Sequence, residues 1–371
     1  MRWELPDPCP AAVRPVETER KKENFALPQQ QQRSRSVFPT LSPLVSRILA
    51  ALLLVLAASI AIGTSLLVFT PLGAKPASGP FAAATPTATG TQLPPTPTPT
   101  LAPVLTPHGT PPALSAAEAM LLDADSGRIL VDMNGEVPRP MASTTKIMTA
   151  VIALQIGDLH QEITVGADAV NEARDNDGSN AGLQVGERLT LRDLLYALLL
   201  PSGDDAAIAI ADGLAGSSEK FVTLMNLFAW RLHLFQTHYA NPDGLPAPNH
   251  YSTAFDLVRL ARYAMTIPLF AEIVRTRVYS VPETATHLAH VWTSTNELLS
   301  TYPGATGIKT GFTGEAGYCL VFSATNKGHH LIGVVLHAAS SEARFQDARR
   351  LLDWGFSLPA LPVSASAPPP L

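Results

Sequence analysis

The pattern of apolar and polar positions separates one long apolar run from the rest of the chain. Residues 48–69 are 22 consecutive residues without a charged side chain. As a helix this run spans roughly 33 Å, enough to cross the core of a bilayer. Arg33, Arg35 and Arg47 precede it, so the positive-inside rule places residues 1–47 in the cytoplasm. The pattern predicts a single-pass transmembrane helix, with the remainder of the chain outside the cell.

A cleaved signal peptide is the competing interpretation of the same run. A 47-residue leader and a 22-residue apolar stretch are both long for a signal peptide. The uncleaved membrane anchor is therefore favoured, and residues 1–47 are predicted to be a disordered cytoplasmic segment.

Residues 70–112 are rich in proline and threonine and almost free of charge. This composition cannot bury a core and prefers extended polyproline conformations, so the segment is predicted to be a disordered linker. At ~3.1 Å per residue the linker reaches on the order of 100 Å, far enough to hold a domain within a cell wall. Residues 358–371 are predicted to be a disordered tail of similar composition, which leaves residues 113–357 as the folded domain.

Strand and helix patterns alternate within the folded domain. Residues 118–134 predict two strands around an Asp-Ser-Gly turn, and residues 317–338 predict a hairpin of two apolar runs. Helical periodicity begins at Ser143 and recurs between the strands. The other predicted helices are residues 189–200, 206–216, 221–235 and 340–356, the last with a serine cap. Strands at both ends around a helical middle predict an α+β fold with a central antiparallel sheet flanked by helices.

Charge and cysteine content narrow the function classes. The chain has 26 basic and 31 acidic residues and no dense basic cluster in its last two thirds, which excludes nucleic acid as a partner. Cys9 and Cys319 lie on opposite sides of the apolar run and do not predict a disulfide. The paired histidines lack an H-E-x-x-H frame, so neither a metal nor another cofactor is predicted.

Ser143 and Lys146 stand three residues apart at the start of an apolar, helix-periodic run. In one interpretation Ser143 caps the helix and Lys146 is a surface charge. In the other, the two side chains share one helical face, and a buried, neutral lysine acts as the base for the serine hydroxyl. The pair alone does not decide between these interpretations.

Two further motifs favour the chemical interpretation. Ser202 and Asp204 lie in Pro-Ser-Gly-Asp-Asp, 59 residues after Ser143, and a Lys-Thr-Gly triplet begins 107 residues later at Lys309. Ser-x-x-Lys, a serine motif of this kind and Lys-Thr-Gly, in this order, are the signature of class A β-lactamases and penicillin-binding proteins. The ordered trio in an exported domain predicts an enzyme that forms an acyl intermediate on serine.

Residues 113–357 resemble the low-molecular-weight penicillin-binding proteins, which are serine-type D-alanyl-D-alanine carboxypeptidases of peptidase family S11. The resemblance extends to "GLQVGERLTLRDLLYALLLPSGDDAA", "NPDGLP", "HYSTAFDLVRLARYA" and "YPGATGIKTGFTGEAGYCLV". It implies the fold that β-lactamases and DD-peptidases share, in agreement with the predicted α+β class. It also implies a bacterial membrane protein that acts on peptidoglycan stem peptides ending in D-Ala-D-Ala and binds β-lactam antibiotics covalently.

By this resemblance Ser143 attacks the D-Ala-D-Ala carbonyl, Lys146 accepts its proton, and Ser202 passes a proton to the departing D-alanine. Water then hydrolyses the acyl-enzyme, and the loss of the terminal D-alanine limits cross-linking. The backbone N–H groups of Ser143 and Phe312 form the implied oxyanion hole. The residues implied in substrate binding are Asp204, Lys309, Thr310, Gly311 and Phe312.

Asp204 departs from the family pattern, in which the second motif is usually Ser-x-Asn. A carboxylate cannot donate the hydrogen bond of the amide, and an ionised one favours the charged form of Lys146 and opposes its role as a base. A second departure is that no arginine lies between Arg277 and Lys309. We therefore expect the substrate carboxylate to rest on Lys309 and Thr310.

Two alternative functions stand beside the carboxypeptidase. A class A β-lactamase needs a deacylating glutamate roughly 35 residues after the second motif. The chain has no glutamate between Glu219 and Glu272, which disfavours this alternative. The other alternative is a catalytically impaired wall-binding homologue, which Asp204 suggests.

Overall fold

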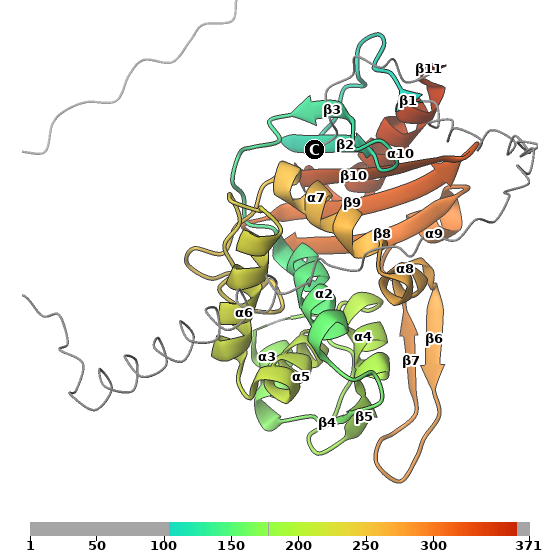
Figure 1. Ribbon diagram of the computed structural model, residues 1–371. Helices are drawn as coiled ribbons and strands as arrows, with labels where there is room; N and C mark the ends of the chain where they lie inside the picture. Colours follow the sequence, from blue (N-terminus) through green and yellow to red (C-terminus); the bar gives the residue numbers. More distant parts are fainter. Residues whose placement is uncertain (1–103, 177, 362–371) are drawn as a thin grey trace, which may run out of the picture. The chain divides into compact units, whose positions relative to one another are not determined.

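The computed structural model describes residues 104–176 and 178–361 (Figure 1). The predicted cytoplasmic segment 1–47, the predicted membrane helix 48–69 and most of the linker 70–112 lie outside these residues. Within the described ranges, no helix combines the length and the hydropathy needed to cross a membrane.

The central sheet has five antiparallel strands in the order β3-β2-β10-β9-β8 (Figure 1). The strands are β2 (Glu118–Asp123), β3 (Ile129–Met133), β8 (Ala305–Thr313), β9 (Gly317–Asn326) and β10 (His329–Ala338). The strand pair β2–β3 and the hairpin β9–β10 match the sequence prediction. Because β2 pairs with β10, the two ends of the domain meet in the middle of the sheet. The predicted α+β fold with a central antiparallel sheet is confirmed.

Both faces of the sheet are buried, and the side chains of β9 alternate between two cores. Leu320 and Phe322 pack with residues of α10 (Ser341–Ser357) on one face, whereas Cys319 and Val321 belong to the core on the other face. A strand covered on both faces has a continuous apolar sequence, which is the pattern that β9 shows. Helix α10 begins at the predicted cap, where Ser340 Oγ accepts a hydrogen bond from the Ala343 N–H at 3.1 Å.

The opposite face of the sheet carries the helical part of the domain, which lies below the sheet in Figure 1. Its helices are η1 (Ala142–Thr145, a 3₁₀ turn), α2 (Lys146–Ile156), α3 (Ala167–Asp175), α4 (Leu191–Leu199), α5 (Asp204–Ala215), α6 (Ser218–Arg231), α7 (Ala254–Met265) and α8 (Pro268–Arg275). The short helix α9 (Leu298–Thr301) instead contributes Leu298 to the core that contains α10. Two small antiparallel sheets join β4 (Glu162–Thr164) to β5 (Arg188–Thr190) and β6 (Val278–Val281) to β7 (His290–Thr293). The apolar helix α2 passes through the middle of this layer, so its N-terminus, which carries Lys146, is enclosed by protein.

The folded domain extends beyond both of its predicted boundaries. Strand β1 (Val104–Leu105) pairs with β11 (Ala360–Leu361), so parts of the predicted linker and tail are ordered. Leu105 is 1% exposed and belongs to the same core as α10. Two-residue strands with a single buried leucine leave no periodic signal within proline-rich flanks, which is why the boundaries at residues 113 and 357 are too narrow.

Replacing Leu105 by alanine tests whether this strand pair supports the domain. We expect Leu105→Ala to lower the free energy of unfolding by about 2–5 kcal/mol, because it leaves a cavity beside α10. Leu361→Ala, at a side chain that is 50% exposed, is the matched control and should change stability by less than about 0.5 kcal/mol. Denaturant unfolding of both variants measures the difference, and equal effects would contradict the ordered boundary.

Candidate active site

The turn that carries Ser143 is shaped by close backbone packing. Ser143 is the second residue of η1, and Ala142 before it has a φ of 48°. A Cβ at Gly244 would lie 2.1 Å from the Ala142 carbonyl oxygen, and one at Gly311 would lie 3.2 Å from the Ser143 nitrogen. A loop and strand β8 therefore press against this turn at two glycines. Such contacts hold the unusual backbone in place.

Ser143 does not cap the helix, so the capping interpretation is wrong. The N-cap positions of η1 and α2 are Met141 and Thr145, and neither makes a side-chain capping bond. The Ser143 hydroxyl instead accepts a hydrogen bond from Lys146 Nζ at 2.9 Å. The serine and the lysine three residues later face each other, as the shared helical face predicts.

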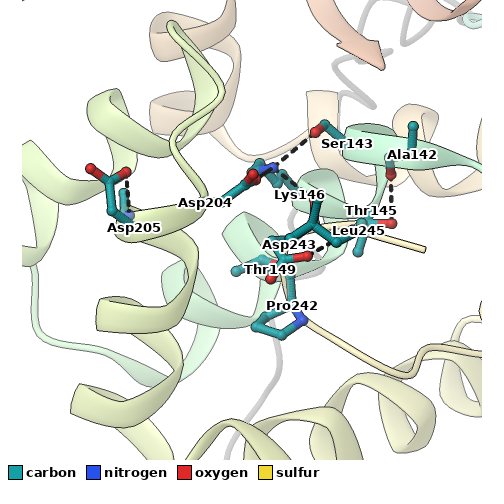
Figure 2. A network of polar contacts seen from close by, with 12 residues as sticks. Ala142, Ser143, Thr145, Lys146, Thr149, Asp204, Asp205, Pro242, Asp243 and Leu245 are labelled. Atoms are coloured by element: carbon teal, nitrogen blue, oxygen red, sulfur yellow. Dashed lines mark hydrogen bonds and ion pairs between the residues drawn. The ribbon is translucent and has the colours of Figure 1, made fainter. Parts of the chain in front are cut away.

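Lys146 is fully buried and makes three hydrogen bonds with its ammonium group (Figure 2). Nζ donates to Ser143 Oγ, to the backbone carbonyl of Asp243 at 2.7 Å and to Asp204 Oδ1. The contact with Asp204 is an ion pair between two side chains that are both buried. These three acceptors satisfy all three ammonium protons, so the interpretation of Lys146 as a surface charge is also wrong.

Two carboxyl groups thus stand beside Lys146. Asp204, the first residue of α5, forms the ion pair, whereas Asp243 offers only its backbone carbonyl. Asp243 Oδ1 accepts a hydrogen bond from the Leu245 N–H at 2.7 Å, and Oδ2 has no partner among the described residues. Burial raises the pKa of Asp243 to about 7, and the positive charge of Lys146 opposes this rise. Asp243 is therefore neutral in mildly acidic solution and adds no second negative charge.

Ser202 lies two residues before Asp204 in the loop that precedes α5. Its φ of 72° is rare for a serine, and its side chain is 4% exposed. The Oγ atom has no hydrogen-bond partner among the described residues. A strained residue with an unsatisfied buried hydroxyl is typical of a functional position, because the strain and the missing bond both reduce stability.

Strand β8 brings the third motif to the Ser143 turn. Lys309 lies in the middle of the strand and not at its start, is 1% exposed, and donates to the Thr310 carbonyl at 3.0 Å. Burial and the nearby charge of Lys146 lower the pKa of Lys309 well below its usual value. The Thr310 hydroxyl bonds to that of Thr295 at 2.6 Å.

Gly311 and Phe312 complete the strand segment beside the nucleophile. A Cβ at Gly311 would lie 3.1 Å from the Ala142 Cβ, so the glycine lets the strand meet the nucleophile turn itself. The Phe312 side chain is 54% exposed and stacks on Tyr318 at 4.4 Å between ring centroids. The Phe312 side chain therefore contacts a neighbouring ring. The role expected for Phe312 in the oxyanion hole involves its backbone N–H and does not depend on this side chain.

Arg344 on α10 is a candidate that the sequence analysis missed. Its guanidinium donates to the Gly311 carbonyl at 3.1 Å, so a positive charge stands directly against the Lys-Thr-Gly strand. Its Nε has no partner among the described residues, and burial lowers its pKa. The expectation that no arginine serves this strand considered only the residues shortly before Lys309. The sequence feature that could have indicated Arg344 is its place beside Phe345, on the apolar face of α10.

His250 stabilises the Ser143 turn through hydrogen bonds. Its Nδ1 accepts the Ala240 N–H at 3.0 Å, so Nε2 carries the proton and donates to Thr145 Oγ1 at 2.8 Å. Thr145 in turn donates to the Ala142 carbonyl at 2.8 Å. Burial lowers the pKa of His250 to about 4, which keeps the ring neutral for this arrangement.

Comparison with known proteins identifies the family. The model of the D-alanyl-D-alanine carboxypeptidase family, peptidase S11, matches residues 106–340. This protein belongs to peptidase family S11. The resemblance that the three motifs indicated is confirmed, and the match covers the whole sheet and the helical part between its strands.

Several S11 relatives and solved structures are similar to this chain. A D-alanyl-D-alanine carboxypeptidase of Streptomyces sp. (strain K15) is 37% identical over 262 residues, covering 67% of this chain and 90% of that one. A crystal structure of the Streptomyces K15 DD-transpeptidase is 38% identical, with a TM-score of 0.65, and covers 67% of this chain and 100% of that one. DacF of Bacillus subtilis (strain 168) is 33% identical, but the chain spans only 63% of its length.

The neutral form of Asp243 gives this S11 protein a testable pH dependence. The pKa of Asp243 is about 7 in the folded protein, whereas an unfolded aspartate has a pKa near 4. Protonation of Asp243 therefore contributes its full stabilisation of the folded state below pH ~4, and this contribution is lost as the pH rises to ~7. Asp243→Asn stays neutral, so its stability relative to the parent protein should rise by on the order of 3 kcal/mol across this window. Denaturant unfolding at pH 4.5 and 7.5 measures this change.

The exposed Asp158 provides the control for this measurement. Asp158→Asn should differ from the parent protein by a constant amount at the two pH values. A difference for Asp243→Asn that also stays constant would show that the buried carboxyl is ionised throughout.

Proposed function

We propose that this protein is a serine D-alanyl-D-alanine carboxypeptidase that removes the terminal D-alanine from peptidoglycan stem peptides. Membership in family S11 and the names of its relatives support this activity. The single observation that carries the mechanism is the 2.9 Å contact between Ser143 Oγ and the buried Lys146 Nζ. This contact joins a nucleophile to its base. It lies beside the Lys-Thr-Gly strand, along which the substrate peptide is proposed to bind.

In the proposed first step, Ser143 Oγ attacks the carbonyl carbon of the last peptide bond while Lys146 in its neutral form takes the hydroxyl proton. The N–H groups of Ser143 and Phe312 stabilise the oxyanion. Lys146 then returns this proton to Ser202 as Ser202 passes its own proton to the leaving nitrogen, and the unpartnered Oγ of Ser202 is consistent with this relay. D-Alanine departs, and water then releases the shortened peptide from Ser143.

The terminal carboxylate of the substrate is proposed to bind where positive charge gathers on β8. Lys309 and Thr310 supply an amine, which a bound carboxylate would favour in its charged form, and a hydroxyl, and Arg344 adds a guanidinium held against Gly311. Guanidinium groups suit carboxylates because their fork matches two oxygens at once. This arrangement favours substrates with a free carboxyl terminus over internal peptide bonds.

The location of the enzyme is part of the same proposal. The apolar residues 48–69 would anchor the chain in the bacterial cell membrane, with residues 1–47 in the cytoplasm. The linker would then let the catalytic domain reach stem peptides in the wall. Peptidoglycan as substrate explains why such a reach is useful, since that substrate is fixed in place.

Release of D-alanine from a peptide ending in D-Ala-D-Ala tests the activity. The full chain in neutral detergent should release D-alanine and form a covalent penicillin adduct on Ser143, detected by mass spectrometry. Ser143→Ala should lower D-alanine release at least about 10³-fold and abolish the adduct. Ser300→Ala, at an exposed serine, should retain both.

Two other outcomes would contradict the carboxypeptidase. Absence of both D-alanine release and adduct would indicate the impaired wall-binding homologue. Rapid penicillin turnover without peptide cleavage would indicate the β-lactamase, which the carboxypeptidase and transpeptidase names of the relatives do not favour.

Asp204→Asn tests whether the additional carboxylate hampers the base. Removing the negative charge beside Lys146 favours the neutral amine, so the acylation rate by penicillin at pH 7 should rise by about tenfold. Asp175→Asn, at an exposed position, is the control. An unchanged or lower rate would show that the site has adapted to the acid.

A further inference from the structure

A cavity of about 760 Å³ opens between the sheet and helices α6, α7 and α8, and Ser143 is not among its lining residues. It is lined by the end of α6, the C-terminal half of α7, α8, the turn after β2, and residues of β9 and β10. Of the described residues of β8, Thr306 alone lines it, three positions and about 10 Å along the strand from Lys309. The volume suits a small ligand, and the lining includes none of the candidate catalytic residues.

Four arginines from three helices line this cavity. They are Arg231, Arg259, Arg262 and Arg275. Such a cluster stands out in a chain whose net charge is −5. Four guanidinium groups around one volume of ligand size create a strongly positive potential inside it.

The lining holds fewer carboxylates than guanidinium groups. Asp125 is the acidic residue of the lining, and it is already paired with His330 Nδ1 at 2.7 Å. Within residues 104–176 and 178–361, no ion pair joins Arg231, Arg259 or Arg275 to a carboxylate. The cavity therefore offers several positive charges to an anion from outside.

Neighbouring groups orient the guanidinium planes. Arg259 lies over the ring of Phe255, 5.4 Å from its centroid, and donates to the His233 carbonyl at 3.3 Å. Arg231 lies over the ring of Phe228 at 5.6 Å. Stacking on an aromatic ring leaves the edge of a guanidinium free to donate hydrogen bonds. Less conformational entropy is then lost when a ligand binds.

The other lining residues indicate the chemistry of the uncharged part of the ligand. Thr306, Ser323 and Thr325 place hydroxyl groups along one wall, and the first two are bonded to each other at 2.7 Å. Buried Ile332, which belongs to the core on the helical face of the sheet, adds apolar surface to the lining. Hydroxyl groups suit a hydroxylated ligand, and several guanidinium groups suit a phosphate, which offers more charge and more acceptor oxygens than one carboxylate.

We propose that this cavity binds the phosphate group of a polyol phosphate ester, either as a free ester or as the headgroup of an anionic lipid. The arginines hold the phosphate, and the threonine and serine hydroxyls contact the polyol. The inference concerns a second site and does not depend on the proposed carboxypeptidase activity. Its test therefore measures binding, separately from D-alanine release.

Calorimetric titration of the full chain in a neutral, phosphate-free detergent solution tests this site. Glycerol 3-phosphate represents the free ester, and dihexanoyl phosphatidylglycerol represents the lipid. At least one should bind saturably below about 10 mM, and the tighter of the two identifies the source. Glycerol and dihexanoyl phosphatidylcholine, which lack net negative charge, should not bind.

Variants assign the binding to the cavity. The double substitution R259Q/R275Q should weaken binding at least about tenfold, because two charge-assisted contacts are lost. Ala271→Phe, which fills space beside α8 without changing charge, should weaken it as well. Arg277→Gln, at an exposed arginine outside the cavity, is the matched control and should bind like the parent protein.

Circular dichroism and thermal unfolding of the same preparations report whether each variant is folded. Absence of saturable binding by both phosphate esters would overturn the proposal. So would equal affinity in the double variant, or equal binding of dihexanoyl phosphatidylcholine, since neither result is compatible with recognition of the phosphate by these arginines.

Discussion

The buried charge of Lys146 is the constraint on which the active site depends. A charged group removed from water is tolerated only when protein groups compensate it. Its three acceptors belong to the Ser143 turn, to the first residue of α5 and to the loop at Asp243. These segments are far apart in the sequence, and displacement of any one of them leaves an uncompensated charge. The ammonium group thus fixes the relative positions of α2, α5 and that loop.

Close backbone packing then places strand β8 against the Ser143 turn. At Gly244 the main chain approaches the Ser143 turn more closely than a Cβ permits, and at Gly311 a Cβ would make unusually tight contacts with the same turn. Ala142 and Ser202 keep positive φ angles near the nucleophile, and such conformations persist only where the surroundings determine them. The fold therefore holds strained residues at the site, and the two cores around the sheet supply the stability that this requires.

The sequence predicted those features that depend on local patterns. The hairpin β9–β10, the cap at Ser340 and the order of the three motifs each have a signal within a short segment. Arg344 has only a weak signal, its place on the apolar face of α10, because its partner is a backbone carbonyl on another element and carbonyl groups do not differ between sequences. The capping interpretation of Ser143 failed for a related reason. A serine before an apolar run matches a cap, but only tertiary packing decides where the 3₁₀ turn begins.

The contacts of Lys146 accommodate two protonation states with the same heavy-atom positions. A charged ammonium donates all three bonds, whereas a neutral amine donates to Asp204 and to the Asp243 carbonyl and accepts the third from the Ser143 hydroxyl. The second state is the one that is ready to take the serine proton. An asparagine oxygen at position 204 would accept the same bond without favouring the charged state. In the proposed mechanism, the balance between these two states would depend on the contact between Lys146 and Asp204, because the heavy-atom positions accommodate both states.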